Sequence, residues 1–162
     1  LITPLRGSVT LYHHDERIVA NPKTRCNFVF VPQGNTLMSG TVRYNLQLAD
    51  PKATDEQMRH VLHVATADFV LDLPEGLDTP CGERGVGFSE GQAQRIAIAR
   101  GLLRPGNILL LDEISASLDE QTERDLFTRL FAECADKTVI MITHRSTVAQ
   151  LCDEVVRLDR LT

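Results

Sequence analysis

Ile108-Leu109-Leu110-Leu111-Asp112-Glu113 joins four consecutive aliphatic residues to two carboxylates. Two further short apolar runs stand on either side of it in the sequence, at residues 28–31 and 139–142. None of the three runs alternates with polar residues, which is typical of parallel strands that are covered on both faces. The three runs therefore predict a mainly parallel sheet in an α/β protein.

Polar side chains follow each run closely. Gln33 follows the first run, Asp112 and Glu113 end the second, and His144 follows the third. Because ligands of open α/β sheets bind at the carboxyl ends of the strands, these side chains predict one shared site. A buried strand that ends in two carboxylates is typical of nucleotide hydrolases, in which Asp112 would hold Mg²⁺ through water and Glu113 would polarise an attacking water. The structural alternatives are two acidic residues that enter a turn and a histidine that only packs.

Helical patterns fill the sequence between the runs. Residues 54–57 have the spacing of a capping box ahead of an amphipathic stretch. Residues 89–92 have the same spacing and begin a helix expected to end near residues 104–106, and Asp119 is a good N-cap for a third helix. Residues 74–87, rich in glycine and proline, predict an ordered loop.

Ser89-Glu90-Gly91-Gln92 allows two interpretations. In the first, Ser89 and Gln92 only form a well-made helix start. In the second, the free N–H groups and the positive dipole end of the helix receive a phosphate. Ser89 would then add a hydroxyl donor, and Gly91 would let the ligand approach the backbone. Glu90 would face such a phosphate unfavourably.

The order of these motifs resembles that of ABC-type ATPases. Five motifs occur in the order of that family: the Q-loop glutamine (Gln33), the signature (residues 88–92), Walker B (Asp112 and Glu113), the D-loop (residues 116–119) and the switch histidine (His144). The similarity covers essentially the whole chain. It implies one nucleotide-binding domain over residues 1–162, with a P-loop NTPase core at about 1–35 and 104–162 and a helical signature subdomain at about 36–103.

The resemblance also implies ATP and Mg²⁺ as cofactors and a sandwich of two such domains around ATP. The catalytic residues would be Glu113, His144 and Gln33, and the metal would contact Asp112 and Gln33. The nucleotide of the partner domain would be contacted by Ser89, Gly91, Gln92 and Asp119. ATP hydrolysis would then drive movement of attached membrane helices.

Two stretches resemble exporters among these proteins. Residues 39–45 are similar to the segment that follows the Q-loop in exporters, and Gly82-Glu83-Arg84-Gly85 is similar to the exporter X-loop, which contacts the membrane domains. The expected partners are thus a second nucleotide-binding domain and a transmembrane domain, the latter through the Q-loop region and the Gly82–Arg84 loop. The transmembrane part of the parent would place the domain at the cytoplasmic face of the inner membrane. A charged loop between glycines can also be plain surface.

The sequence lacks a phosphate-binding loop of the form GxxxxGK[ST], which needs glycines and a lysine. Its three lysines, Lys23, Lys52 and Lys137, each follow a proline or an aspartate. We therefore expect a chain that is truncated at the N-terminus and that neither binds nor hydrolyses ATP alone. A strand at residues 154–158 is the last element we expect.

Composition narrows the function classes. The net charge of -5 argues against a nucleic-acid partner, and 43% hydrophobic with 24% charged residues is an ordinary globular balance. The four cysteines show no metal-ligand spacing, and no apolar run approaches the ~20 residues of a membrane span. Two alternatives to a transport ATPase are a non-hydrolysing interaction module and a chromosome-maintenance ATPase. The second would need a long coiled coil between Gln33 and Ser89, where no heptad run occurs.

Overall fold

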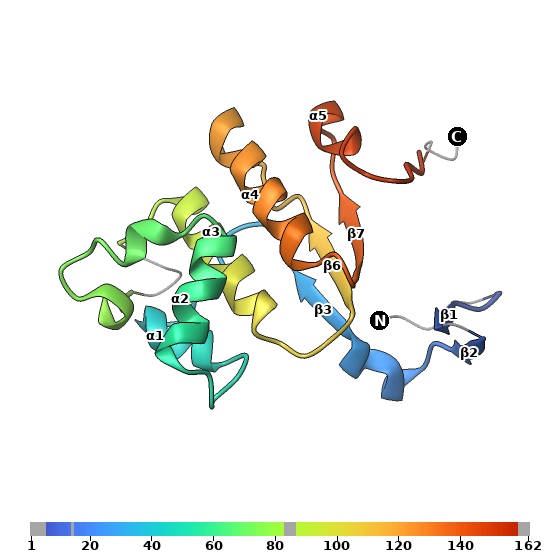
Figure 1. Ribbon diagram of the computed structural model, residues 1–162, viewed down its shortest axis with the longest axis horizontal. Helices are drawn as coiled ribbons and strands as arrows, with labels where there is room; N and C mark the ends of the chain where they lie inside the picture. The colour runs from blue at the N-terminus through green and yellow to red at the C-terminus, as the bar shows by residue number, and fades with distance from the viewer. Residues whose placement is uncertain (1–5, 14, 83–86, 159–162) are drawn as a thin grey trace.

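The computed structural model describes residues 6–13, 15–82 and 87–158. Its centre is a parallel sheet in the order β3-β6-β7 (Figure 1), made of β3 (Phe28–Val31), β6 (Ile108–Asp112) and β7 (Thr138–Ile142). Leu111 of β6 pairs with Val31 on one side and with Met141 on the other. The three strands therefore end side by side, which confirms the predicted parallel sheet.

Two helices cover one face of this sheet, α3 (Glu90–Leu102) and α4 (Glu120–Glu133). Successive side chains of a strand point to opposite faces, and the odd-numbered residues of β3 and β6 lie in the core. That core joins the following buried side chains from the sheet and the two helices: Val29, Val31, Leu109, Leu111, Ile96, Ile98, Leu126, Phe127 and Leu130. Burial of this apolar face stabilises the α/β arrangement.

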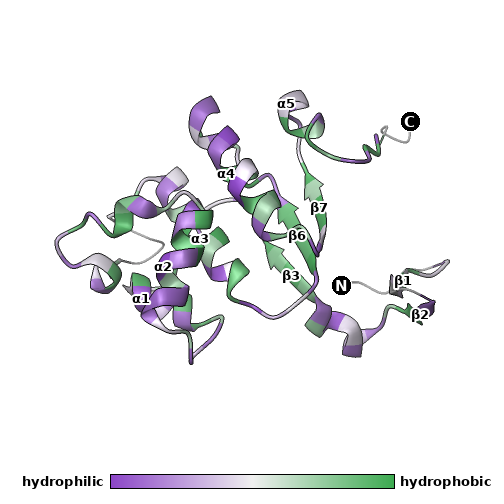
Figure 2. Cartoon of the chain, in the orientation of Figure 1, coloured by the Kyte–Doolittle hydropathy of each residue, from purple (hydrophilic) through white to green (hydrophobic). Residues whose placement is uncertain are grey.

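The opposite face of the sheet is open in the part of the chain that the structure describes. Phe30, Ile140 and Ile142 are 57%, 50% and 60% exposed, and the strands carry hydrophobic colour along their length (Figure 2). The prediction that the strands are covered on both faces is therefore wrong for these residues. The physical reason is that α3 and α4 both pack on the same face.

Helix α3 begins as its sequence predicts. Ser89 is the N-cap, and the helix ends at Leu102, slightly before the expected stop at residues 104–106. It is buried on nearly all sides because residues 93–99 are mostly alanine and isoleucine. Near its end, a Cβ on Gly101 would lie 2.7 Å from Cγ2 of Val31, so glycine permits the close approach of helix and sheet.

A group of smaller elements packs beside α3. It consists of β4 (Gly40–Thr41), α1 (Val42–Gln47), α2 (Asp55–Val64), η2 (Asp68–Val70), η3 (Gly76–Asp78) and β5 (Pro80–Cys81). Arg43 of α1 donates hydrogen bonds to Asp55 and Asp78 and so ties three of these elements together. The predicted capping box at residues 54–57 is present, and the predicted loop at 74–87 contains η3 and β5.

The remaining elements lie towards the chain ends. They are the antiparallel hairpin of β1 (Thr10–His13) and β2 (Glu16–Val19), the turn η1 (Pro22–Asn27) and the short helix α5 (Ser146–Ala149). The predicted strand at residues 154–158 is wrong, since these residues are exposed and have no regular structure. A strand needs a neighbouring ladder to satisfy its backbone, and no strand pairs with them among the described residues.

Candidate functional site

The carboxyl edge of the sheet carries four of the residues that the sequence singles out: Gln33, Asp112, Glu113 and His144. Glu113 and His144 follow the adjacent strands β6 and β7, and Gln33 follows β3 on the other side of β6. Gln33 is exposed, whereas Asp112 and Glu113 are half-buried. Parallel strands bring these residues to one edge, as expected from the sequence.

Glu113 has an unusual backbone. Its φ angle is +45°, in the left-handed region that a residue with a side chain seldom adopts. Such a conformation costs on the order of 1–3 kcal/mol, and residues of this kind cluster at functional sites. The backbone N–H of Glu113 donates to the carbonyl oxygen of Ile142 at 2.9 Å, which holds the turn against β7.

The side chains of Glu113 and His144 form a pair. Nδ1 of His144 lies 3.4 Å from Oε1 of Glu113, and the two side chains are 69% (His144) and 30% (Glu113) exposed. A carboxylate can accept a proton from water, and an imidazole can donate to or accept from a nearby oxygen. The pair is therefore suited to orient and activate a water that enters from solvent.

Ser89 and Gln92 close the capping box at the start of α3. Oγ of Ser89 accepts from the backbone N–H of Gln92 at 3.2 Å, and the N–H of Ser89 donates to Oε1 of Gln92 at 2.9 Å. The capping box therefore accounts for Gln92 by a contact within the chain, without any ligand. Ser89 is exposed, and as an acceptor in the box its hydroxyl keeps its own hydrogen for donation.

Gly91 is buried against the loop that follows β6. A Cβ at this position would lie 3.0 Å from the carbonyl oxygen of Ser117 and 3.2 Å from Cδ2 of Leu118. The absence of a side chain is therefore explained by close packing inside the chain. A role of Gly91 towards a nucleotide stays a prediction.

Asp119 begins α4 as the sequence predicts. Its carboxylate accepts from the backbone N–H groups of Gln121 and Thr122 and from the hydroxyl of Thr122. The backbone N–H of Thr122, and then its hydroxyl, hold the pKa of Asp119 below its ordinary value. The capping role is evident from these bonds, and a role towards nucleotide stays a prediction.

The order of the motifs and their position at the carboxyl edge of the sheet can be compared with known protein families. A family model described as "ABC transporter" matches residues 1–116, more than half of the chain. The chain belongs to the ABC transporter family. This confirms the resemblance drawn from the motif order, and with it the α/β fold of an ABC ATPase.

Several curated relatives carry names of ABC proteins. The chain is 38% identical over 160 residues to an uncharacterized ABC transporter ATP-binding protein, y4gM, of Sinorhizobium fredii, with 98% of this chain and 27% of the relative covered. It is 37% identical over 155 residues to the cyclolysin secretion/processing ATP-binding protein CyaB of Bordetella pertussis, covering 95% and 22%. The chain spans only 13% to 27% of the length of such relatives.

A solved ABC structure supports the same family fold. It is that of a bacterial Atm1-family ABC exporter with ATP bound, which is 35% identical to this chain and superimposes with a TM-score of 0.72. The match covers 80% of this chain and 22% of the exporter chain. The likeness therefore extends to the fold of most of this chain, while the bound ATP is a property of the exporter structure.

Two polar residues of this ABC chain have roles that the sequence did not predict. Gln94, only 2% exposed, donates through Nε2 to the carbonyl oxygen of Pro32 at 3.1 Å and so joins α3 to the residue before Gln33. Arg145 donates to the buried carboxylate of Glu123 at 2.7 Å. The signal for Gln94 was a glutamine in a helix stretch that is mostly alanine and isoleucine, whereas Arg145, next to His144, gave none.

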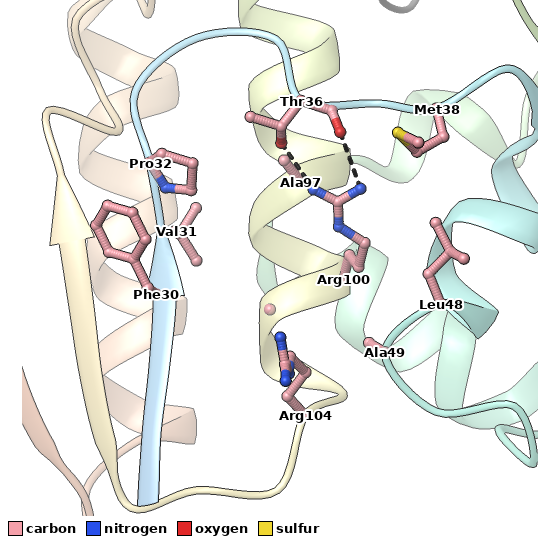
Figure 3. Close-up of a pocket in the computed structure, with 11 residues that line it drawn as sticks. Phe30, Val31, Pro32, Thr36, Met38, Leu48, Ala49, Ala97, Arg100 and Arg104 are labelled. Atoms are coloured by element: carbon pink, nitrogen blue, oxygen red, sulfur yellow. Dashed lines mark hydrogen bonds between the residues drawn. The ribbon is translucent and has the colours of Figure 1, made fainter. Parts of the chain in front are cut away.

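A pocket of about 380 Å³ lies between the end of β3, the segment after Gln33 and the last turns of α3. Arg100 reaches across it and donates to both the carbonyl and the hydroxyl oxygen of Thr36 (Figure 3). Burial, and then the charge of Arg104, lower the pKa of Arg100. Met38 and Leu48 add exposed apolar surface to the rim.

The described residues contain neither a membrane-spanning helix nor a metal cluster. No helix among them has the length and apolar character needed to cross a membrane. Within the same residues no three His, Cys, Asp or Glu side chains gather as a metal site. Glu83, Arg84 and Gly85 of the loop predicted to face a membrane domain lie outside the described residues, and Gly82 alone is described.

Proposed function

We propose that the chain is part of the ATP-hydrolysing domain of an ABC exporter. The observation that carries the proposal is the Glu113–His144 pair at the carboxyl edge of the parallel sheet, with Nδ1 and Oε1 3.4 Å apart. Glu113 and His144 each follow one of two adjacent strands. Their order in the sequence is that of the Walker B and switch-histidine motifs of the family. The exporter names among the relatives support transport outward rather than inward.

ATP, when bound, supplies the phosphoanhydride bond that is hydrolysed. Glu113 acts as the general base, a contribution of about 10²–10⁴ in rate, and its backbone has the left-handed φ of +45° in the turn that follows β6. His144 orients the water or the γ-phosphate. Gln33 lies on the other side of the site and completes it from β3.

A Mg²⁺ ion fits the donor set at Asp112. The carboxylate is half-buried at the end of β6. Mg²⁺ is commonly bound through one or two carboxylates and keeps several waters, so a site with a single protein carboxylate and the amide of Gln33, which follows the neighbouring strand β3, suits it. Asp112 would hold the ion, with Gln33 as a second contact.

The residues of the signature motif act on a nucleotide that is bound by a second domain. Ser89 is exposed at the N-terminus of a thirteen-residue helix, where backbone N–H groups and the dipole favour an anion. We infer that Ser89, Gly91, Gln92 and Asp119 face the nucleotide held by a partner domain. Residues 36–103 would form the helical arm that carries the signature.

The pocket of Arg100 is proposed as the contact with a transmembrane domain. Its lining includes apolar Met38 and Leu48 together with the charged side chains of Arg100 and Arg104. An acidic and apolar cytoplasmic segment of the membrane part complements this surface. The Gly82–Arg84 loop would supply a second contact, and the domain would lie at the cytoplasmic face of the inner membrane.

One observation favours a different function for the chain alone. None of its 162 residues forms a GxxxxGK[ST] loop, so a non-hydrolysing module that docks on membrane helices or a partner ATPase is the second candidate. The test is MgATP hydrolysis by the purified protein, measured with the chain as it stands and with a version in which a phosphate-binding loop is restored. Magnesium-dependent turnover supports the ATPase, whereas a folded protein that never hydrolyses ATP supports the docking module.

A further inference from the structure

Arg145 connects three segments around the candidate site. Its Nη1 donates to Oε2 of Glu123 on α4 at 2.7 Å. Its Nη2 donates to the carbonyl oxygens of Ala116 and Leu118, each at 3.3 Å. The residue itself directly follows His144. One guanidinium therefore joins the histidine segment, the loop after β6 and helix α4.

The anchor of this contact is a buried charge. Glu123 is only 5% exposed, and its second oxygen accepts from the hydroxyl of Thr147 at 3.3 Å. A buried carboxylate without a cationic partner is strongly unfavourable, so Arg145 is held in one place. Its fork of donors then has fixed directions, of which two point to backbone carbonyls.

The loop that Arg145 holds also touches the signature helix. Ala116 and Leu118 flank Ser117, whose carbonyl oxygen lies 3.0 Å from the place where a Cβ of Gly91 would be. The same loop starts at Glu113, because the N–H of Ala116 donates to the carbonyl oxygen of Glu113. A shift of this loop would therefore displace both the base and the start of α3.

We propose that Arg145 is a positioning residue for the hydrolysis reaction. It holds His144 beside Glu113 and holds residues 116–118 against the signature helix α3. The Glu113–His144 pair and the start of α3 therefore move together. The inference rests on the proposed ATPase function. It assigns Arg145 an effect on turnover of bound ATP rather than on ATP affinity.

The substitution Arg145→Lys distinguishes a positioning role of Arg145 from a role in stabilising the fold. In Arg145→Lys the ammonium can still pair with Glu123, but a point charge cannot reach Glu123 and two carbonyls in the planar geometry of a guanidinium. In the full-length protein, we expect kcat to fall about tenfold or more, since a misplacement of ~1 Å at a catalytic group can cost ~10²-fold. The KM for ATP should change less than about twofold, because the interaction acts after binding.

The matched control is Arg124→Lys, an exposed arginine on α4 that pairs with Glu120 at 3.9 Å. It should leave kcat, KM and Tm at wild-type values. For Arg145→Lys, Tm should remain close to that of this control. A wild-type kcat in Arg145→Lys overturns the proposal, and so does a fall in kcat that follows an equal loss of folded protein.

The same experiment separates this inference from the proposed function. If the wild-type protein does not hydrolyse MgATP, the proposed function fails and the positioning role fails with it. If wild type hydrolyses ATP, Glu113→Gln does not, and Arg145→Lys equals wild type, only the positioning role fails.

Discussion

Oε1 of Glu113 and Nδ1 of His144 lie 3.4 Å apart at the ends of adjacent parallel strands. The register of β6 and β7 sets this distance, because Asp112 pairs with Ile142 and the N–H of Glu113 donates to the carbonyl of Ile142. His144 follows Ile142 by two residues. The pair is therefore built by backbone pairing, and its chemistry can be tested by side-chain changes that leave that pairing intact.

In a full-length protein with a restored phosphate-binding loop, Glu113→Gln should keep ATP binding and the fold but lower turnover by roughly 10²-fold or more. The amide preserves the size of the side chain and cannot accept a proton. Steady-state phosphate release and equilibrium ATP binding measure the two effects. The control is Glu120→Gln, an exposed carboxylate on α4. Near-normal turnover in Glu113→Gln would remove Glu113 from the role of base.

His144→Ala should slow hydrolysis without preventing ATP binding. The ring is 69% exposed, so its removal leaves no cavity in the core. The same phosphate-release and binding measurements apply, with thermal unfolding to report the fold. His60→Ala, which loses only the exposed contact of His60 with Glu133, is the matched control. Unfolding of the domain by His144→Ala would show instead that the histidine is structural.

The 162-residue chain by itself should not bind MgATP with useful affinity. Nothing in its sequence replaces the row of backbone donors and the lysine of a GxxxxGK[ST] loop. Titration calorimetry of the isolated chain with MgATP tests this. A micromolar dissociation constant would contradict it.

Ser89 should act on the nucleotide of a partner domain. A helix N-terminus binds an anion only when the ligand can reach it, and Ser89 is exposed. The test uses a dimeric version of the protein in which a phosphate-binding loop has been restored. Two variants of it are needed, one with this loop broken and one with Ser89→Arg. Both also carry Glu113→Gln, so that bound ATP is trapped rather than hydrolysed.

In mixed dimers of these variants, action on the partner places both lesions in one site and leaves the other intact. ATP trapping should then recover to one site per dimer. Action within the same chain would leave one lesion in every site and no recovery. If mixed dimers form and trap no ATP, the capping box is the better account of Ser89.

The parts of the candidate site that could be predicted from the sequence are those that depend on neighbouring residues. The strand ends at Asp112 and Ile142 could be located because each apolar run stops at polar residues. The caps at Ser89 and Asp119 could be located because their bonds are made within three residues along the chain. The interpretation of Gly91 could not be settled in this way. Its neighbour, Ser117, is 26 positions away, and only folding brings the two together.

Motif order, apolar runs and caps are read from neighbouring residues, so the amino-acid sequence was enough to predict the family, the parallel sheet and the starts of α3 and α4. The three-dimensional packing was needed to show that α3 and α4 share one face of the sheet, that residues 154–158 form no strand, and that Gln94 and Arg145 bind distant backbone carbonyls. Burial and long-range hydrogen bonds depend on which segments meet in space, and that is not encoded in short stretches of sequence. Glu123 lies on α4, and the whole of β7 separates it from Arg145 in the sequence. The residues around Arg145 therefore do not reveal that the two side chains pair.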